Sequence, residues 1–491
     1  MASAGGRPPR NEARSRRRGA SDKEAAAQTK STPVDDHVDG GPRRPRPDHQ
    51  AARCRGGGGR KLAGAGRAGI CAEGEGGVKV GVVNTRWSRQ SASSGTHMIK
   101  TLHPFPARMA PGLALDGLIG LKRGSVVLDP MTGSGMVLRQ AIDLGHRAIG
   151  FDLDPLAVLM AGVWTTPIDN HRATELAAQV VELAASTSSA WTRLPWLDED
   201  VETRKFVDYW FASEQRRELR RLVQALLTVE SKLESEGDRA IANLLRLSVS
   251  RIIVTKEQAA SLARDTSHSR PHRVATTSSY NVLKGFERSV GAVLTRLRES
   301  PPKGIAQVSQ GDARCLDRIE NDSVDAIVTS PPYLNAIDYL RGHRMSLVWL
   351  GWSVPALRQI RSISIGSERG PDVPGESSSD VAEAMLGNAQ IDGRHARMIS
   401  RYAEDLSSTL GEVARVLKPT GQATFVVGNS CLKGVFIKND EGVAAAARQY
   451  GLTEISRHVR ELPQRSRYLP VTGAALAKRM RTETVLTFAT A

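Results

Sequence analysis

The segment TSPPYLNAIDY, residues 329–339, carries the residue types in this sequence that are best suited to chemistry. It follows DSVDAIV, whose apolar and β-branched residues predict a short buried strand. The two prolines remove two backbone N–H donors and stiffen the chain, so the turn displays carbonyl oxygens beside a serine and a tyrosine. Such a turn could offer acceptors and a flat face to a ligand. Taken alone, a β-turn with a core tyrosine explains the same residues equally well.

A second segment, SVVLDPMTGSGMVLRQAIDLGHRAIGFDLDP (125–155), predicts a strand, a Gly-rich turn, a helix and another strand. Gly133 and Gly135 let the backbone approach a ligand closely. Asp152 ends the second strand, 23 residues after Asp129, where a carboxylate can accept both hydroxyls of a ribose. The turn lacks the third glycine of a dinucleotide site and the Gly-Lys-Ser/Thr of a P-loop, which disfavours a diphosphate ligand. A nucleoside without phosphates, such as S-adenosylmethionine, suits it better.

A third predicted strand ends at Asp312, within QVSQGDARCLD. The Asp312 carboxylate could accept a hydrogen bond from the amino group of adenine, and Ala313 offers a backbone N–H to the ring. The strand that leads into the TSPPY turn follows next in the chain.

Together, DPMTGSG, FDLDP, GDA and TSPPY resemble the motifs of the DNA amino-methyltransferases, which methylate exocyclic amines of cytosine or adenine. HPFPAR (103–108) is similar to the segment before the family's Gly-rich motif, and 412–430 and 483–489 are similar to its later strands. The resemblance implies an α/β, Rossmann-like S-adenosylmethionine-dependent methyltransferase fold with a mixed, mostly parallel sheet of about seven strands. The implied cofactor-binding residues are Phe105, Asp129, Met131 (where the family usually has phenylalanine), Gly133, Gly135, Asp152, Asp312 and Ala313.

The resemblance assigns catalysis to Ser330, Pro331, Pro332 and Tyr333. An exocyclic amine is a poor nucleophile because its lone pair is delocalised into the base. The Ser330 side chain and the Pro331 carbonyl are implied as acceptors that draw the nitrogen toward tetrahedral geometry. Tyr333 is implied as a flat face for a base swung out of the helix. In the family a serine before the prolines accompanies cytosine more often than adenine, so cytosine N4 is favoured and adenine N6 remains the alternative.

The chain divides into four predicted parts: a disordered basic tail (1–97), a cofactor-binding part of the core (98–165), a mainly helical insertion (166–304) and a catalytic part of the core (305–491). Residues 1–95 hold 19 Lys and Arg against 9 Asp and Glu, and so supply +10 of the net charge of +16. A solvated tail, or translated sequence ahead of a start at Met98, explains this composition better than a nucleic-acid-binding arm does.

The insertion is expected to contain two long amphipathic helices, 206–234 and 239–254. The basic segment RDTSHSRPHRV (264–274) then suits contacts with phosphates, although a solvated loop between helices is the plainer alternative. A polar stretch within 354–400 is a second candidate for reading the target. The tentative DNA-binding residues are Arg264, Arg270, Arg273 and Asn335.

Several chemistries are disfavoured by what the sequence lacks. Methylation at cytosine carbon 5 needs a cysteine nucleophile, typically in a Pro-Cys pair, and no such pair occurs. His268 and His272 have the spacing of metal ligands, but Pro271 separates them and no cysteine accompanies them, so no metal site is expected. No run of eighteen apolar residues and no secretory signal occurs, so a cytoplasmic protein without a membrane partner is expected.

The expected activity is therefore site-specific methylation of double-stranded DNA, in restriction-modification with a cognate restriction endonuclease or in DNA protection. Methylation of an RNA base is a competing enzyme class, since related folds with similar proline turns act on RNA. A degenerate DNA-binding module without activity is the non-enzymatic alternative. The joint presence of Asp152, Asp312 and the Ser-Pro-Pro-Tyr turn disfavours it.

Overall fold

The computed structural model describes residues 101–105, 109–188, 192–264, 271–334, 338–367, 378–462 and 482–490. The predicted tail (1–97), Arg270 and Asn335 lie outside these described residues. Within them, no helix is both long enough and apolar enough to cross a membrane.

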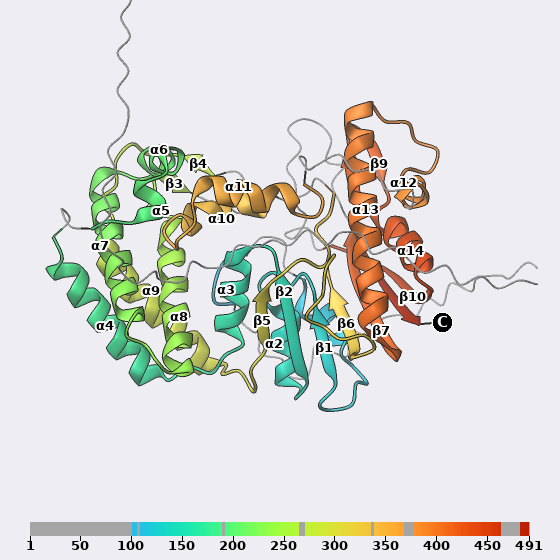
Figure 1. The fold of residues 1–491 in the computed structure, drawn as a ribbon, viewed down its shortest axis with the longest axis horizontal. Coiled ribbons are helices and arrows are strands. Elements are labelled where there is room, and N and C mark those ends of the chain that lie inside the picture. Colours follow the sequence, from blue (N-terminus) through green and yellow to red (C-terminus); the bar gives the residue numbers. More distant parts are fainter. Residues whose placement is uncertain are drawn as a thin grey trace, which may run out of the picture. The chain divides into compact units, whose positions relative to one another are not determined.

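A seven-stranded sheet forms the centre of the fold, in the order β10-β11-β7-β6-β1-β2-β5 (Figure 1). Neighbouring strands from β7 to β5 are parallel, whereas β11 runs antiparallel to both β7 and β10. The expectation of a mixed, mostly parallel sheet of about seven strands is confirmed. The strands are β1 (Val126–Asp129), β2 (Arg147–Asp152), β5 (Gln307–Gln310), β6 (Val324–Thr329), β7 (Leu417–Gly428), β10 (Leu452–Glu461) and β11 (Thr482–Thr490).

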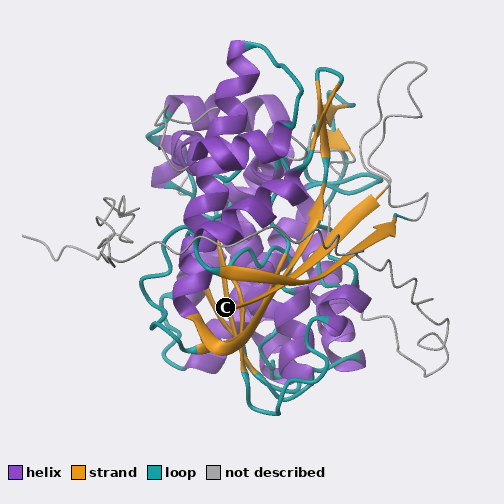
Figure 2. Ribbon diagram, turned by 90° about the vertical axis from the view of Figure 1, so that its right-hand side faces the viewer, coloured by secondary structure: helices purple, strands orange, loops and turns teal. Residues whose placement is uncertain are grey.

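Helices lie on both sides of the sheet (Figure 2), so the central strands are buried on both faces. Successive residues of a strand point to opposite faces, and the two hydrophobic clusters follow this alternation. Val127 and Val328 pack into one cluster, and Leu128 and Ile327 pack into the other. The near-continuous apolar runs of β1 and β6 are explained by this double burial.

The core helices are α1 (Pro111–Asp116), α2 (Met136–Asp143), α3 (Pro155–Trp164), α10 (Tyr339–Leu347), α11 (Val354–Ile363), α12 (Ser379–Leu386), α13 (Gly393–Val416) and α14 (Asn439–Gln449). A small hairpin of β8 (Ser430–Leu432) and β9 (Val435–Ile437) follows β7. The buried helix expected within 342–352 is α10 and the turn after it, in which Trp349 is fully buried.

A helical insertion separates β2 from β5. It contains α4 (Asn170–Ser186), α5 (Pro195–Asp198), α6 (Val201–Trp210), α7 (Ser213–Glu230), α8 (Glu236–Ile253), α9 (Val282–Glu299) and the two-residue strands β3 (Ala263–Arg264) and β4 (His272–Arg273). The prediction of one continuous helix over 206–234 is wrong, because the chain is extended at Phe211. The Phe211 ring is buried edge-on against Trp349, 5.2 Å between centroids, and this packing outweighs the helical pattern.

The insertion holds the segment that follows the TSPPY turn. The Trp196 indole Nε1–H donates to the Val348 carbonyl at 2.9 Å, and the Val354 N–H donates to Thr203 Oγ1 at 2.8 Å. The ends of α10 and α11 are therefore fixed by residues of the insertion. Both helices line the cavity described below.

Gly135 offers a direct test of this packing. It adopts φ +85°, and a Cβ there would lie 2.9 Å from both Cα and Cβ of Ala161 in α3. Gly135→Ala should lower the free energy of unfolding by about 2–4 kcal/mol, from left-handed strain and overpacking together. Urea denaturation followed by tryptophan fluorescence measures it.

Gly291→Ala is the matched control, because Gly291 lies inside α9 with open space around its Cα. It should raise stability by about 0.5–1 kcal/mol. Equal behaviour of the two variants would contradict the close α2–α3 approach.

Candidate active site

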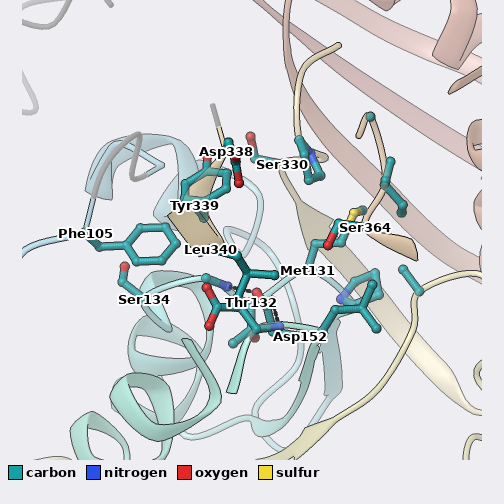
Figure 3. A pocket seen from close by; sticks show the side chains of 18 of the residues that line it. Phe105, Met131, Thr132, Ser134, Asp152, Ser330, Asp338, Tyr339, Leu340 and Ser364 are labelled. Carbon is teal, nitrogen blue, oxygen red and sulfur yellow. Dashed lines mark hydrogen bonds between the residues drawn. The ribbon is translucent and has the colours of Figure 1, made fainter. Parts of the chain in front are cut away.

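A cavity of about 410 Å³ opens at the carboxyl ends of β1, β2, β5 and β6 (Figure 3). Eight of the residues predicted for the site line it, and four do not. Those that line it are Phe105, Asp129, Met131, Gly133, Asp152, Ala313, Ser330 and Pro332; the four that are not among the lining residues are Gly135, Asp312, Pro331 and Tyr333.

The Gly-rich turn and Asp152 form one wall of the cavity. The Asp152 carboxylate accepts the Gly133 N–H at 2.8 Å and the Asp154 N–H at 2.9 Å. Gly133 has φ +50°, and a Cβ there would lie 3.1 Å from the Phe105 ring. Glycine is therefore required both by the backbone conformation and by the close approach of Phe105. Gly135, by contrast, serves the packing of α2 against α3.

A buried hydrogen bond joins the two motifs. Thr329 Oγ1 donates to Asp129 Oδ1 at 2.7 Å, across 200 residues of sequence, and the Met131 N–H donates to the same oxygen at 3.2 Å. Burial raises the pKa of Asp129 to about 7, although these two hydrogen bonds lower it. Burial also raises the pKa of Asp152 to about 6, with a further rise from Asp154.

The Ser-Pro-Pro-Tyr turn is held by hydroxyl groups. The Ser330 Oγ–H donates to the Val426 carbonyl at 2.9 Å, which leaves the lone pairs of the oxygen available as acceptors. Tyr402, fully buried in α13, donates to the Pro332 carbonyl at 3.0 Å, and Ser430 donates to the Leu334 carbonyl at 2.9 Å. Sequence reasoning missed Tyr402 and Ser430, because they lie about 70 and 96 residues from their partners.

The Tyr333 hydroxyl is hydrogen-bonded to Ser330 of the same turn and to Glu483. It donates to Glu483 Oε1 at 3.2 Å, and Arg460 holds the other oxygen of that carboxylate at 2.6 and 3.0 Å. Burial, and then the charge of Glu483, raise the pKa of Tyr333 well above its usual value. The hydroxyl therefore stays protonated and anchors the ring to β11.

Asp312 is engaged by a neighbour. Arg314 donates through Nε at 2.9 Å and Nη2 at 2.6 Å to its two carboxylate oxygens, and also pairs with Asp405 of α13. Gly311 and Ala313, on either side, line the cavity instead. The contact with adenine that was expected of Asp312 stays a prediction. In the structure the Asp312 carboxylate is bound by Arg314.

An unforeseen pair connects the cofactor-side strand to α10. His343 Nδ1 and Asp154 Oδ2 form a buried hydrogen-bonded pair, and the other Asp154 oxygen accepts the Leu156 N–H at 2.9 Å. The Phe105 ring stacks on Tyr339 of the same helix with centroids 5.2 Å apart. The one sequence signal for these contacts is the spacing of Tyr339 and His343, which lie one turn apart and therefore on the same face of α10.

Of the tentative DNA-binding arginines, Arg264 and Arg273 are described by the structure, and neither lines the cavity. Arg264 donates to the backbone carbonyls of Ser261 and Ala263, and Arg273 lies 4.8 Å above the Tyr209 ring. Among the described residues, no group of three His, Cys, Asp or Glu side chains is arranged to hold a metal ion.

The order of the sheet, the reversed β11 and the Gly-rich turn after β1 define the Rossmann-like fold of S-adenosylmethionine-dependent methyltransferases. The lining fits that cofactor: Asp129 and Asp152 suit a sulfonium cation and a ribose, and Gly133 permits close approach. No lysine or arginine lies in the turn 130–135 to hold phosphates.

The chain is similar to type II methyltransferases, although no family model matches it. It is 21% identical to M.MvaI of Kocuria varians over 386 residues, 74% of this chain and 84% of the relative. It is 22% identical to M.BsoBI of Geobacillus stearothermophilus, over 50% of this chain and 51% of the relative. For M.MjaII of Methanocaldococcus jannaschii the identity is 21%, over 61% and 70%. The predicted resemblance to DNA amino-methyltransferases is confirmed.

The similarity to solved structures is weaker. One is a TehB-like methyltransferase of Corynebacterium glutamicum (9% identity, 78% of this chain and 87% of that one, TM-score 0.25). Another is a geranyl diphosphate methyltransferase (9% identity, 78% and 77%, TM-score 0.30). At these TM-scores the likeness carries no argument about the site.

The raised pKa values predict a pH-dependent stability. An acid whose pKa is higher in the folded than in the unfolded state stabilises the fold less as pH rises between those two values. Asp129 and Asp152 should therefore weaken the cofactor-free protein between about pH 4 and 7. Asp129→Asn removes one of these charges, and the side-chain oxygen of the introduced asparagine can still accept the hydrogen bond from Thr329.

Urea unfolding measures the free energy of unfolding at about pH 5 and about pH 8. The difference between the variant and the wild type should shift in favour of the variant at the higher pH. A constant difference would contradict the buried ionisation.

Proposed function

We propose that this protein transfers a methyl group from S-adenosylmethionine to an exocyclic amine of a DNA base, with cytosine N4 favoured, in restriction-modification or DNA protection. The observation that carries the proposal is the Ser330 hydroxyl. It lines the cavity that also contains Asp129 and Asp152, while its proton is donated to the Val426 carbonyl. The similarity to type II methyltransferases supports DNA as the substrate.

The cofactor would be held by the first wall of the cavity. The Asp152 carboxylate is oriented by the Gly133 and Asp154 N–H groups, and it keeps acceptor capacity for ribose hydroxyls. Phe105 and Met131 supply apolar lining, and Ala313 lies at the end of the third parallel strand. When bound, S-adenosylmethionine supplies the electrophilic methyl group.

The Ser-Pro-Pro-Tyr turn would hold the amine. Ser330 Oγ and the Pro331 carbonyl accept its two hydrogens, so its lone pair is freed from the ring as the nitrogen becomes tetrahedral. Tyr402 donates to the Pro332 carbonyl and so fixes the next peptide of the turn. As the new N–C bond forms, the methyl–sulfur bond would break and the thioether S-adenosylhomocysteine would keep its electron pair. The methylated nitrogen would then be acidic and release a proton to water. No residue of the chain has to act as a strong base beforehand.

The Tyr333 ring would stack on a base swung out of a DNA duplex, which enzymes acting on a paired base require. Its hydroxyl bond to Glu483 fixes the tilt of the ring. In type II systems a nuclease that cuts the unmethylated site accompanies such an enzyme, and a cognate restriction endonuclease is accordingly proposed as partner.

The activity is tested by incubating the protein with duplex DNA and labelled S-adenosylmethionine and identifying methylated nucleosides by mass spectrometry. N4-methylcytosine is the expected product. If N6-methyladenine forms instead, the enzyme class is retained, but the assignment of cytosine as the target base is wrong. Transfer to RNA alone, or binding of DNA without transfer, would overturn the proposal. Single-molecule sequencing of DNA from cells with and without the gene then gives the recognition sequence.

Asp152→Ala tests the cofactor wall. Losing hydrogen bonds to a charged carboxylate costs roughly 1.5–3 kcal/mol each, so affinity for S-adenosylmethionine should fall at least tenfold. Calorimetry on the folded variant measures this, with Asp208→Ala as control, because Asp208 is exposed on α6. Unchanged affinity in the Asp152 variant would remove this residue from the cofactor site.

Ser330→Ala should slow transfer with little change in cofactor affinity, because the serine faces the amine. The acceptor matters most as the nitrogen becomes tetrahedral, so kcat should fall more than KM rises. Single-turnover assays measure this step. Methylation at the wild-type rate would reduce Ser330 to a turn residue.

Tyr333→Phe and Tyr333→Ala separate the hydroxyl from the ring. Phe keeps the stacking face and loses the Glu483 bond, so a modest change is expected. Ala should weaken capture of the flipped base by roughly 1–3 kcal/mol of stacking. Equal losses in both variants would contradict a stacking role.

A further inference from the structure

We propose that Arg341, Arg358 and Arg361, at the mouth of the cavity, bind the phosphodiester backbone beside the target nucleotide, and that Asp338 competes with phosphate for two of them. The proposal rests on the proposed function in taking DNA as the polyanion. It moves the main DNA contact from the β3–β4 region of the insertion to α10 and α11.

The position of the three arginines is the first reason. All of them line the cavity that also contains Ser330 and Asp152. In Figure 1, α10 and α11 lie beyond the ends of β1, β2 and β6 from which the site is built. A nucleotide whose base reached Ser330 would bring its phosphates past these helices.

The local charge is the second reason. Arg344 joins the three lining arginines, and Asp338 and Glu202 are the carboxylates that pair with the group. Burial lowers the pKa of Arg344, and the positive charges of Arg361 and Arg341 lower it further. An excess of positive charge at a cavity mouth attracts an anion, and arginine forks match phosphate oxygens.

The ion pairs of these arginines involve side chains that are exposed or partly exposed, so a phosphate can reach them. Arg358 pairs with Glu202 of α6 in an exposed position, where such pairs contribute little. Arg361 Nη2 lies 2.7 Å from Asp338 Oδ2, and Arg341 Nε lies 3.5 Å from the same oxygen. Asp338 Oδ1 meanwhile accepts the Arg341 N–H at 3.2 Å and caps α10.

Because Asp338 both caps α10 and pairs with the arginines, the proposal predicts opposite changes in DNA affinity for substitutions at Arg361 and at Asp338. Arg361→Gln removes a cation and should weaken DNA binding. Asp338→Asn removes the competing charge but keeps a helix cap, since Asn and Asp cap equally well. It should release Arg361 and tighten binding.

The experiment measures the affinity of the full-length protein for a fluorescent non-specific duplex between about 50 and 200 mM salt. Arg358→Gln and Arg361→Gln should each reduce the slope of log K against log salt by about 1. Asp338→Asn should raise the affinity and steepen the slope. Arg147→Gln is the matched control, because Arg147 is exposed at the amino end of β2, across the sheet from the cavity; its slope should equal that of the wild type.

Calorimetry with S-adenosylmethionine separates this proposal from a cofactor contact and from the proposed function. Cofactor affinity should stay unchanged in both arginine variants; a loss confined to the cofactor would overturn the proposal. Slopes equal to the wild type, or weaker binding by Asp338→Asn, would also overturn it. If the arginine variants lose DNA affinity while the wild type methylates no DNA, the phosphate contact stands and the proposed activity falls.

Discussion

The buried hydrogen bond from Thr329 Oγ1 to Asp129 Oδ1 is the constraint on which the rest of the site depends. It ties the end of β6 to the end of β1, so the Gly-rich turn and the Ser-Pro-Pro-Tyr turn leave the sheet side by side. The bond is buried and one partner is a carboxylate, so its loss would leave an unsatisfied polar group that costs more than the bond itself contributes. Two motifs that lie 200 residues apart in the chain thus become one cavity.

Rigidity around that bond comes from hydroxyl groups more than from charges. Ser330, Tyr402 and Ser430 each use a hydroxyl to bond a backbone carbonyl on or beside the proline turn. Hydroxyls do this without the desolvation cost that a buried charge would carry. The ionisable groups are placed at the cavity itself, where burial raises the pKa values of Asp129 and Asp152. A cationic ligand bound there would favour their ionised forms.

The helical insertion supports the site from behind. Through Trp196 and Thr203 it fixes the segments that become α10 and α11, and through Phe211 it packs on Trp349. These two helices carry the stacked Tyr339, the buried His343 and the arginines at the cavity mouth. An insertion between two strands of the sheet therefore shapes a surface that is formed by residues more than a hundred positions later.

The sequence by itself determined the strands that end at the cavity and eight of the residues that line it. Apolar runs such as those ending at Asp129 and Thr329 mark buried parallel strands, and Gly133 marks a turn that needs a positive φ; both signals are local. The sequence could not show that the helix predicted over 206–234 is interrupted at Phe211, because the extended backbone there accompanies packing of its ring on the distant Trp349. Nor could it foresee Tyr402, Glu483 or Arg314, whose importance arises from partners far away in the chain. Those contacts depend on how the elements come together in three dimensions, which neither the spacing nor the type of a residue specifies.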